Sequence, residues 1–258
     1  MKFVRYQEKS SRHISYGYIT ESKIQPIQGN PFGEYTLNDA PLPIDQARLL
    51  SPVEPSKVVA LAANYAGATG VTDEMAEQVV FVKPPTSVVG PYDDVVSPFK
   101  NVNIWGEAEL GIVINRRIKD VSLDEAKTAI GGYVCANDVT ADNVEGRDHH
   151  LLRSKGADTF CPIGPWMDTA FDPTDAQVES YQNGRLIRQG RLRDRIWKDA
   201  QIISWLSQWM TLEQGDVILT GTPPRVVERT YLKDGDIYEV KIEGLGELRN
   251  KFVCKRRI

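Results

Sequence analysis

The sequence has little of three things: long apolar runs, positive charge in excess of negative charge, and cysteine. Its 258 residues carry 31 Lys and Arg against 35 Asp and Glu, which argues against a surface for nucleic acid or anionic membrane. The longest apolar stretches, such as VVALAA at 58–63, are too short to span a bilayer. Residues 1–20 lack the apolar segment of a secretion signal, so we expect a cytoplasmic protein. The cysteines Cys135, Cys161 and Cys254 lack C-x-x-C spacing, which argues against a zinc site or a disulfide framework.

The chain also has no internal repeat and no low-complexity tract. Its hydrophobic content of 41 % is typical of a globular protein, and its length suits one large domain with a small extra lobe. Strand patterns at 2–7 and 14–20 precede a turn-rich stretch at 26–43. We therefore predict a small N-terminal lobe over residues 1–50 and a main domain over residues 51–258.

Predicted strands outnumber predicted helices in the rest of the chain. A short helix follows the cap candidate Ser122, and a helical stripe of apolar residues over 202–212 is predicted to end at Gly215. Buried strands are expected at 57–65, 108–114, 133–138 and 217–224, with further short strands over 235–253. The sequence therefore predicts a mainly β (α+β) fold with short helices.

Two glutamates stand two residues apart in NVNIWGEAELGIVI at 101–114. In a strand, residues i and i+2 point to the same face, so Glu107 and Glu109 would share one side. Two carboxylates that lie so close together repel each other unless a basic side chain or a metal ion lies between them. The alternative is that both are solvated charges on an edge strand, although the apolar residues around them favour a partly buried pair with a partner.

A third acid, Asp138, ends the predicted strand at 133–138, with one helix between it and the glutamate strand. Strands connected in this way usually lie side by side, so Glu107, Glu109 and Asp138 are expected to converge. Three carboxylates without a soft ligand suit Mg²⁺, Mn²⁺ or Ca²⁺ better than zinc or copper. Lys155, in LLRSKGADTFCPIGPW at 151–166, is either a surface lysine or a functional cation within a closely packed segment.

Six segments of the chain, in order and at fitting spacing, match those of a known family: GEAELGIVI, GGYVCANDVT, SKGADTFCPIGPW, YQNGRLIRQG, LSQWMTLEQGDVILTGTPPRV and IEGLGELRN. Over residues from about 57 to 253 the chain resembles the fumarylacetoacetate hydrolase family, and its bacterial isomerase and decarboxylase members in particular. The first fifty residues match only loosely. The resemblance implies a mixed β-sandwich roll, a homodimer, and Mg²⁺ or Mn²⁺ held by Glu107, Glu109 and Asp138.

The same resemblance implies a chemistry for the site. In the family, the metal chelates the adjacent oxygens of a 2-oxo or enol acid, and a divalent cation spreads the charge of a developing enolate. Lys155 matches the family's active-site lysine, which stabilises an anion near the metal. Thr222 matches a residue whose backbone or hydroxyl approaches the substrate, with Gly221 permitting the approach. The alternative for Thr222 is that the G-T-P turn simply ends a strand.

The chain departs from the family in two segments beside the site. The family's hydrolases and decarboxylases carry a histidine and a glutamate after N-Y, a dyad that activates water, but this chain has Ala68 and Val71 there. Either another residue serves as the general base, or this protein does not activate water in that way. Leu192 and Arg195 stand where the family tends to have threonine and methionine, so the shape of the substrate should differ.

Another departure concerns charge. Members of the family often read N-D-V-T-A-R-D-x-Q, whereas this chain has Asp142 and Glu145 in place of the arginine and the glutamine. Replacing a cation by an anion should disfavour a second substrate carboxylate. Arg147 or Arg153 is the alternative source of positive charge.

Two groups of residues are candidates for a relocated base. His149 and His150 lie between Asp138 and Lys155 in the sequence, and we take His150 as the candidate, with a solvated loop as the alternative. Acidic residues of the 67–78 loop, namely Asp73, Glu74 and Glu77, form the second group, with an ordinary acidic surface as the alternative.

The resulting hypothesis is a divalent-metal-dependent enzyme that isomerises or decarboxylates a small 2-oxo or 2-hydroxy-enol acid through a metal-bound enolate. Neither reaction needs activated water, which fits the absent histidine. The first rival is a C–C hydrolase of the acylpyruvate or fumarylpyruvate type with a relocated base. The others are a non-catalytic protein that keeps the fold and a biosynthetic enzyme that uses the same site.

Overall fold

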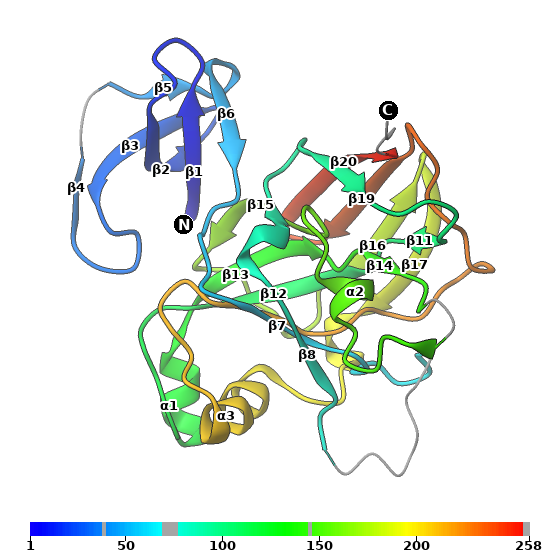
Figure 1. Cartoon of the computed structure of the whole chain (residues 1–258). Coiled ribbons are helices and arrows are strands. Elements are labelled where there is room, and N and C mark those ends of the chain that lie inside the picture. The colour runs from blue at the N-terminus through cyan, green and yellow to red at the C-terminus, as the bar shows by residue number, and fades with distance from the viewer. Residues whose placement is uncertain (38–39, 69–76, 144–145, 255–258) are drawn as a thin grey trace.

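The computed structural model describes residues 1–37, 40–68, 77–143 and 146–254. Figure 1 shows that strands dominate these residues and that the helices are short. The predicted mainly β fold is therefore confirmed. No helix in the described part of the chain is long and apolar enough to cross a membrane.

One long curled sheet runs through the molecule. Its thirteen strands are β1 (Lys2–Glu8), β2 (Ile14–Thr20), β3 (Lys23–Gly29), β4 (Tyr35–Leu37), β5 (Leu42–Pro43), β6 (Ala47–Leu50), β7 (Val58–Leu61), β8 (Val80–Lys83), β9 (Val88–Val89), β12 (Ala108–Ile114), β13 (Ile130–Asn137), β15 (Cys161–Asp168) and β18 (Val217–Leu219). The main path is β4-β3-β2-β1-β15-β13-β12-β18-β7-β8, and β5, β6 and β9 pair with β3, β1 and β15. The centre of this path, β13-β12-β18, carries most of the predicted site.

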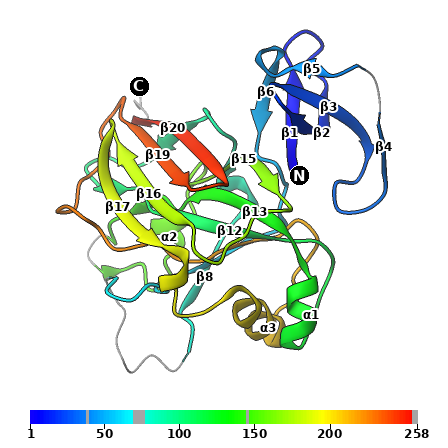
Figure 2. The ribbon, with the colours of Figure 1, turned by 180° about the vertical axis from the view of Figure 1, so that it is seen from behind.

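A second sheet packs over β12, β13 and β15. Its five strands are β10 (Asp94–Ser97), β16 (Gln177–Gln182), β17 (Arg185–Arg191), β19 (Ile237–Ile242) and β20 (Gly246–Cys254). They follow the order β10-β20-β19-β16-β17, and Figure 2 shows β16, β17, β19 and β20 in front of β12 and β13. A separate pair joins β11 (Ile104–Trp105) to β14 (Thr140–Ala141).

The α-helices of the described residues are α1 (Leu123–Thr128), α2 (Leu152–Lys155) and α3 (Asp199–Trp209), with 3₁₀ turns at Ile44–Gln46, Pro85–Ser87 and Leu192–Asp194. Helices α1 and α3 pack against each other at one end of the molecule (Figure 1). The predicted cap of α1 is confirmed, because Ser122 and Glu125 exchange side-chain to backbone hydrogen bonds in a capping box.

Strand β12 is buried on both faces, which explains its continuous apolar run. Leu110 and Ile112 join the cluster between the two sheets, whereas Val113 packs with Val134 on the opposite face. Glu109 lies on the same side as Val113, as the period of two predicts. Residue 107 directly precedes the strand, so the two glutamates flank its first residue.

The first fifty residues form β1 to β6, gathered at one side of Figure 1. The turn-rich interpretation of 26–43 is wrong in part, since the end of β3 and the short strands β4 and β5 lie there. They form because both pair with β3, with Ile27 opposite Leu37 and Ile24 opposite Leu42, so tertiary pairing outweighs the local turn signals. β1 also pairs with β15, which joins these strands to the main sheet. The division of the chain near residue 50 stays a prediction.

The predicted end of the long helix at Gly215 is wrong. Helix α3 ends at Trp209, and Met210 is already extended. The chain leaves the helix there because Leu212 exchanges backbone hydrogen bonds of 2.9 and 3.0 Å with Ile118. Gly215, at φ +85°, forms the turn that leads into β18 instead.

Candidate active site

The three predicted carboxylates lie together at the ends of β12 and β13. The strands are antiparallel with Ala108 opposite Asn137, so the residue before β12 and the residue after β13 are neighbours. The amide of Glu107 donates to Oδ1 of Asn137 at 3.0 Å, and the amide of Asp138 donates to the carbonyl of Glu107 at 2.9 Å. One carboxylate oxygen from each of Glu107, Glu109 and Asp138 lies within 4.8 Å of the other two.

Three cations surround two of these acids. Nζ of Lys155 donates to Oε2 of Glu107 at 2.8 Å and forms an ion pair with Asp138. Nζ of Lys83 lies 2.5 Å from Oδ1 of Asp138, and Nη2 of Arg188 lies 3.0 Å from Oε1 of Glu107. Among the described residues, no ion pair neutralises Glu109, although its exposed fraction is only 1 %.

Helix α2 carries Lys155 into the cluster. The lysine is 7 % exposed, so the alternative of an ordinary surface lysine is wrong. Its Nζ also donates to Oγ1 of Thr140 at 2.6 Å and lies 4.8 Å from the centre of the Phe81 ring. Burial lowers the pKa of Lys155, but Asp138 and Glu107 together raise it above its ordinary value. The ammonium is therefore a fixed positive charge and not a base near neutral pH.

The two glutamates have opposite protonation tendencies. Burial raises the pKa of Glu107, but Lys155 and Arg188 outweigh it and bring the pKa to about 2. Burial also raises the pKa of Glu109, and here the charges of Asp138 and Glu107 raise it further, well above the ordinary value. A cation beside Glu109 would relieve this repulsion, and the oxygen donors of the cluster are those that Mg²⁺ and Mn²⁺ prefer.

The turn after β18 completes this part of the site. The amide of Gly221 donates to Oε2 of Glu109 at 2.6 Å. Gly221 has φ +87°, and a Cβ there would lie 2.9 Å from Cβ of Asn64, so a side chain is excluded both by conformation and by space. The next residue, Thr222, has a buried hydroxyl with no hydrogen-bond partner. A buried hydroxyl without a partner is costly in free energy.

The candidate bases are not brought to the carboxylates by the described structure. His149 and His150 are exposed in the turn before α2, and Glu77 is exposed. Ala68 is half-buried, and its amide donates to the carbonyl of Tyr65 at 3.1 Å. The catalytic role of His150 stays a prediction. The candidates Asp73 and Glu74 lie outside the described residues, as does Val71, which stands where the family has its glutamate.

The other departures have plain structural explanations. Leu192 is fully buried in the core between the sheets. Arg195 is 4 % exposed and forms an ion pair of 2.6 Å with Asp199. The carboxylate of Asp142 accepts a hydrogen bond of 2.9 Å from the amide of Asn103. Glu145 lies outside the described residues.

The alternative sources of positive charge named from the sequence are both exposed. The guanidinium of Arg153 lies 5.6 Å from the centre of the Phe99 ring, stacked over it. Arg147 is exposed two residues before His149 in the same loop. Neither is among the ion-pair partners of the clustered carboxylates in the described structure.

Sequence reasoning missed two charged residues of the site, Lys83 and Arg188. Lys83 is fully buried at the end of β8. The sequence does contain an indication of this, because Lys83 ends the apolar run VVFV directly before two prolines. Arg188 is 4 % exposed on β17, where nothing in the local pattern separates it from its exposed neighbour Gln189. Only the packing of the second sheet against the first brings it to Glu107.

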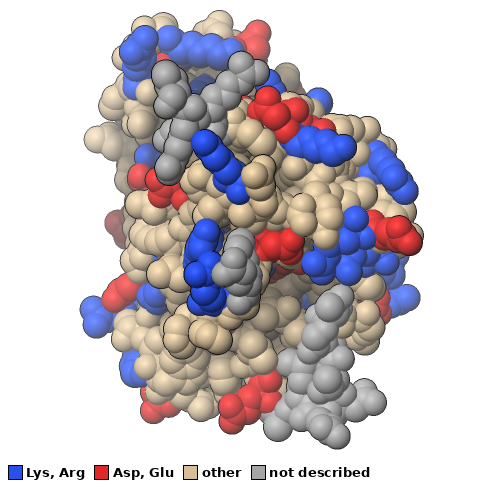
Figure 3. Space-filling view, turned by 45° about the vertical axis from the view of Figure 1, so that its right-hand side comes forward, with Lys and Arg blue, Asp and Glu red and all other residues tan. Residues whose placement is uncertain are grey.

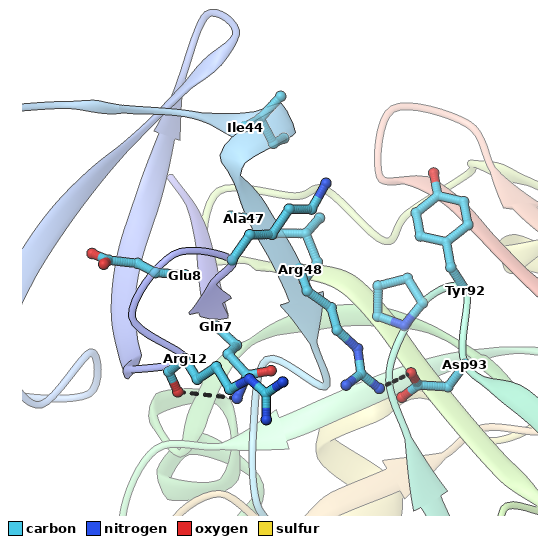
Figure 4. A pocket seen from close by; sticks show the side chains of 11 residues that line it. Gln7, Glu8, Arg12, Ile44, Ala47, Arg48, Tyr92 and Asp93 are labelled. Atoms are coloured by element: carbon cyan, nitrogen blue, oxygen red, sulfur yellow. Dashed lines mark hydrogen bonds and ion pairs between the residues drawn. The ribbon is translucent and has the colours of Figure 1, made fainter.

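Two of the cavities formed by the described residues are relevant to the position of the site. A cavity of about 660 Å³ separates β1 and β6 from the turn at Pro91–Asp93, and Figure 4 shows Arg48 pairing with Asp93 across it. A second, of about 620 Å³, is lined by Gly67, Arg188, Pro224, Arg225, Val227, Glu228 and Arg229. We place the site at the second, because its lining includes Arg188, which contacts Glu107 of the carboxylate cluster. On the face shown in Figure 3, basic and acidic side chains lie next to each other in several places.

Comparison with known proteins extends these observations. The family model described as "Fumarylacetoacetate (FAA) hydrolase C-terminal" matches residues 57–253, and the model "Rv2993c-like, N-terminal" matches residues 1–52. The chain is 38 % identical over 250 residues to Protein Rv2993c of Mycobacterium tuberculosis, covering 93 % of this chain and 91 % of that one. It is 36 % identical over 230 residues to the human mitochondrial oxaloacetate tautomerase FAHD2A, covering 82 % and 71 %.

Solved structures show the same relationship in three dimensions. The fold matches that of 2-hydroxyhepta-2,4-diene-1,7-dioate isomerase from Mycobacterium marinum with a TM-score of 0.89 and 35 % identity, covering all of both chains. It also matches maleylpyruvate hydrolase from Sphingobium sp. SYK-6, solved with manganese(II) and pyruvate, with a TM-score of 0.82 and 27 % identity, covering 99 % of this chain and all of that one.

Proposed function

The chain belongs to the fumarylacetoacetate hydrolase family, and from that premise we propose that it is a divalent-metal-dependent tautomerase of small 2-oxo acids. Relatives in this family are enzymes, named as isomerases, hydrolases and an oxaloacetate tautomerase. The observation that carries the proposal is the cluster of Glu107, Glu109 and Asp138, in which one buried acid lacks a positive partner within the described structure.

The donor set fits Mg²⁺ or Mn²⁺. Lys83, Lys155 and Arg188 form ion pairs with Glu107 and Asp138 but not with Glu109. A divalent ion beside Glu109 would supply the cationic contact that this carboxylate lacks. The ion would be held by Glu107, Glu109 and Asp138. The structure of the related maleylpyruvate hydrolase contains manganese(II), which supports a metal of this kind. When bound, such an ion acts as a Lewis acid that lowers the energy of negative charge on substrate oxygens.

The chain's own residues bind and orient the substrate. Lys155, held protonated by its two carboxylate partners, supplies a fixed positive charge to an enolate. Thr222 offers its unpartnered hydroxyl as a hydrogen-bond donor to the substrate. Gly221, the residue before it, allows the backbone of this turn to lie close to the substrate. Moving a proton between carbon and oxygen of the substrate needs no activated water, which agrees with Ala68 at the position of the family's histidine. Loss of CO₂ from a carboxylate carried by C3 of a 2-oxo acid leaves the same enolate and draws on the same stabilisation.

The test measures proton exchange at C3 of oxaloacetate and acetylpyruvate by NMR, with Mg²⁺, with Mn²⁺ and with EDTA. Exchange by metal alone is subtracted, since divalent ions catalyse enolisation without protein. We expect metal-dependent exchange without cleavage of the carbon chain, lost in Glu109→Gln and kept in Glu247→Gln, whose side chain forms an exposed ion pair with Lys241. If Glu109→Gln changes neither the rate of proton exchange nor the metal content, the proposal is refuted. If no 2-oxo acid of a wider panel shows exchange or product formation, a non-catalytic protein is favoured.

A second candidate is hydrolysis of a C–C bond by a relocated base. It is favoured by the similarity to maleylpyruvate hydrolase and to 2,4-didehydro-3-deoxy-L-rhamnonate hydrolase, the latter 38 % identical over 207 residues. This candidate predicts cleavage products in the same NMR experiment. It also predicts that changing His149, His150 or Glu74 abolishes cleavage while the metal stays bound. The homodimer implied by the family resemblance likewise stays a proposal, which sedimentation of the purified protein tests.

A further inference from the structure

The cavity of about 660 Å³ lies between two parts of the chain that are distant in sequence, and none of the clustered carboxylates lines it. One wall is formed by β1, the turn after it and β6, and the other by the turn Pro91–Asp93. The ion pair of 2.5 Å between Arg48 and Asp93 joins the two walls (Figure 4). Pockets that hold small molecules have volumes of about 300–1,000 Å³ and often lie where two structural units meet.

Apolar side chains line much of this cavity. They are Ile44, Ala47 and Leu49 on one wall and Pro91 and Tyr92 on the other. An apolar surface of this kind favours a ligand that brings an apolar body of its own, because both are then removed from water.

Tyr92 is the most exposed large hydrophobic side chain of the described residues, at 73 %. Its backbone has φ +66°, a conformation that is unfavourable for a residue other than glycine. The conformation is held by the amide of Tyr92, which donates to the carbonyl of Arg249 at 2.8 Å. The fold therefore keeps an aromatic ring in water beside an apolar cavity, where its face is available for stacking.

Two cations on the opposite wall have no carboxylate partner among the described residues. The guanidinium of Arg12 forms no ion pair or hydrogen bond there, although the backbone carbonyl of the same residue accepts a hydrogen bond of 3.0 Å from Gln7. Nζ of Lys9 donates to the backbone carbonyl of Asp45 at 2.7 Å, which is a neutral acceptor. Both side chains can therefore pair with an anion without breaking an existing ion pair of the described structure.

The two acids that line the cavity have other partners. Asp93 is paired with Arg48, and Glu8 accepts a hydrogen bond of 2.7 Å from the hydroxyl of Ser11. Figure 4 shows the carboxylate of Glu8 turned away from the pair of Arg48 and Asp93. With three cationic side chains against these two acids, the lining is net positive.

We propose that this cavity is a second binding site, which takes a small organic anion with a planar apolar body. The anionic group lies at Arg12 and Lys9, and the body packs against Tyr92 and Leu49. A guanidinium pairs with either a carboxylate or a phosphate through two parallel hydrogen bonds, and an aromatic ring stacks on a planar group. The inference does not depend on the chemistry of the carboxylate cluster, so it stands or falls independently of the proposed tautomerase.

The test measures binding of benzoate, phenyl phosphate and benzyl alcohol to the full-length protein, in the presence of Mn²⁺, by isothermal titration calorimetry. These probes share one planar apolar body and differ in the group that it carries. We expect one anion to bind per chain with an affinity at least about tenfold above that of benzyl alcohol. The tighter of benzoate and phenyl phosphate identifies the anionic group. If neither anion binds more tightly than the alcohol, the inference is overturned.

Two variants assign the binding to this cavity. In Arg12→Gln the affinity for the preferred anion should fall by about tenfold, while that for benzyl alcohol stays within about twofold. Because the Arg12 guanidinium has no partner in the described structure, the Tm without ligand should not change. Tyr92→Ala should weaken the binding of all the probes, since the stacking surface is lost.

Binding of the probes at the carboxylate cluster is the main alternative, and Glu109→Gln separates it from the inference. The affinity for the anion should be the same in Glu109→Gln as in the wild type. Arg117→Gln, which removes an exposed arginine that faces Glu213 at 3.5 Å, should also leave it unchanged. An affinity that falls in Glu109→Gln but not in Arg12→Gln would place the ligand at the cluster and overturn the inference.

Discussion

The amide of Gly221 donates a hydrogen bond of 2.6 Å to Oε2 of Glu109, a residue 112 positions earlier in the chain. The bond joins the turn after β18 to the middle of the acidic cluster. The residue after Gly221 is Thr222, whose buried hydroxyl has no hydrogen-bond partner. The position of this turn therefore helps to fix where Glu109 points.

Gly221→Ala should destabilise the protein and misplace Glu109. A left-handed φ of +87° costs a non-glycine residue about 1–2 kcal/mol, and the new Cβ would lie 2.9 Å from Cβ of Asn64. Gly235→Ala is the matched control, because Gly235 has φ +90° and a Cβ added there would meet no atom within 4 Å. Urea unfolding should show a larger loss for Gly221→Ala, and equal losses would mean that the approach to Asn64 is unimportant.

Glu109→Gln should have opposite effects on the metal-free and the metal-loaded protein. Burial and the charges of Asp138 and Glu107 disfavour the ionised form of Glu109 in the folded protein, and glutamine has no ionised form. The change should therefore raise the free energy of unfolding of the EDTA-treated protein by about 1 kcal/mol or more. The same change should abolish the rise in Tm that Mn²⁺ gives the wild type, because a ligand is lost. Scanning calorimetry with and without Mn²⁺ checks both signs, and a Mn²⁺ response equal to that of the wild type would contradict the assignment.

Lys83→Met should be strongly destabilising. Lys83 is fully buried and lies 2.5 Å from Asp138, and removing one partner of a buried ion pair costs about 3–5 kcal/mol. Lys127→Met breaks the exposed pair with Asp124 and should cost less than about 0.5 kcal/mol. The measurement is urea unfolding of both variants. Similar small losses would show that Lys155 alone suffices to hold Asp138.

Thr222→Val should separate stability from activity. Its buried hydroxyl has no partner in the protein, so a methyl group in its place should leave the free energy of unfolding unchanged or raise it by about 1 kcal/mol. If the hydroxyl binds substrate, kcat/KM should fall by about tenfold. Thr222→Ser should keep most of the activity. A loss of stability in Thr222→Val without a loss of activity would favour the alternative that the residue only ends a strand.

The three thiols should differ in reactivity. Burial raises the pKa of Cys161 to about 12 and raises that of Cys135 well above its ordinary value, so both should stay protonated at pH 8. Cys254 is exposed at the end of β20. Titration with a chromogenic disulfide at pH 8 should detect about one reactive thiol in the native protein and all 3 after denaturation. Rapid reaction of two or three thiols in the native state would show that the core opens readily.

The sequence by itself determined the fold class and the carboxylates. Period-two alternation and continuous apolar runs predicted the central strands, because burial on one or both faces leaves a pattern in consecutive residues. The sequence also predicted that Glu107, Glu109 and Asp138 lie close together. Each is at or near the end of such a strand, and strands connected along the chain usually lie side by side. The helix cap at Ser122 was equally local, since the cap and its glutamate are three residues apart.

Only the tertiary structure decided which cations reach these acids. Lys83, Lys155 and Arg188 come from β8, α2 and β17, and nothing in their local sequence states that three separate elements meet at one cluster. The strands β4 and β5 and the early end of α3 also depend on partners distant in the chain. Local pattern reports which face of an element is buried, whereas a charge acquires its partner, and hence its pKa and its role, from packing between elements.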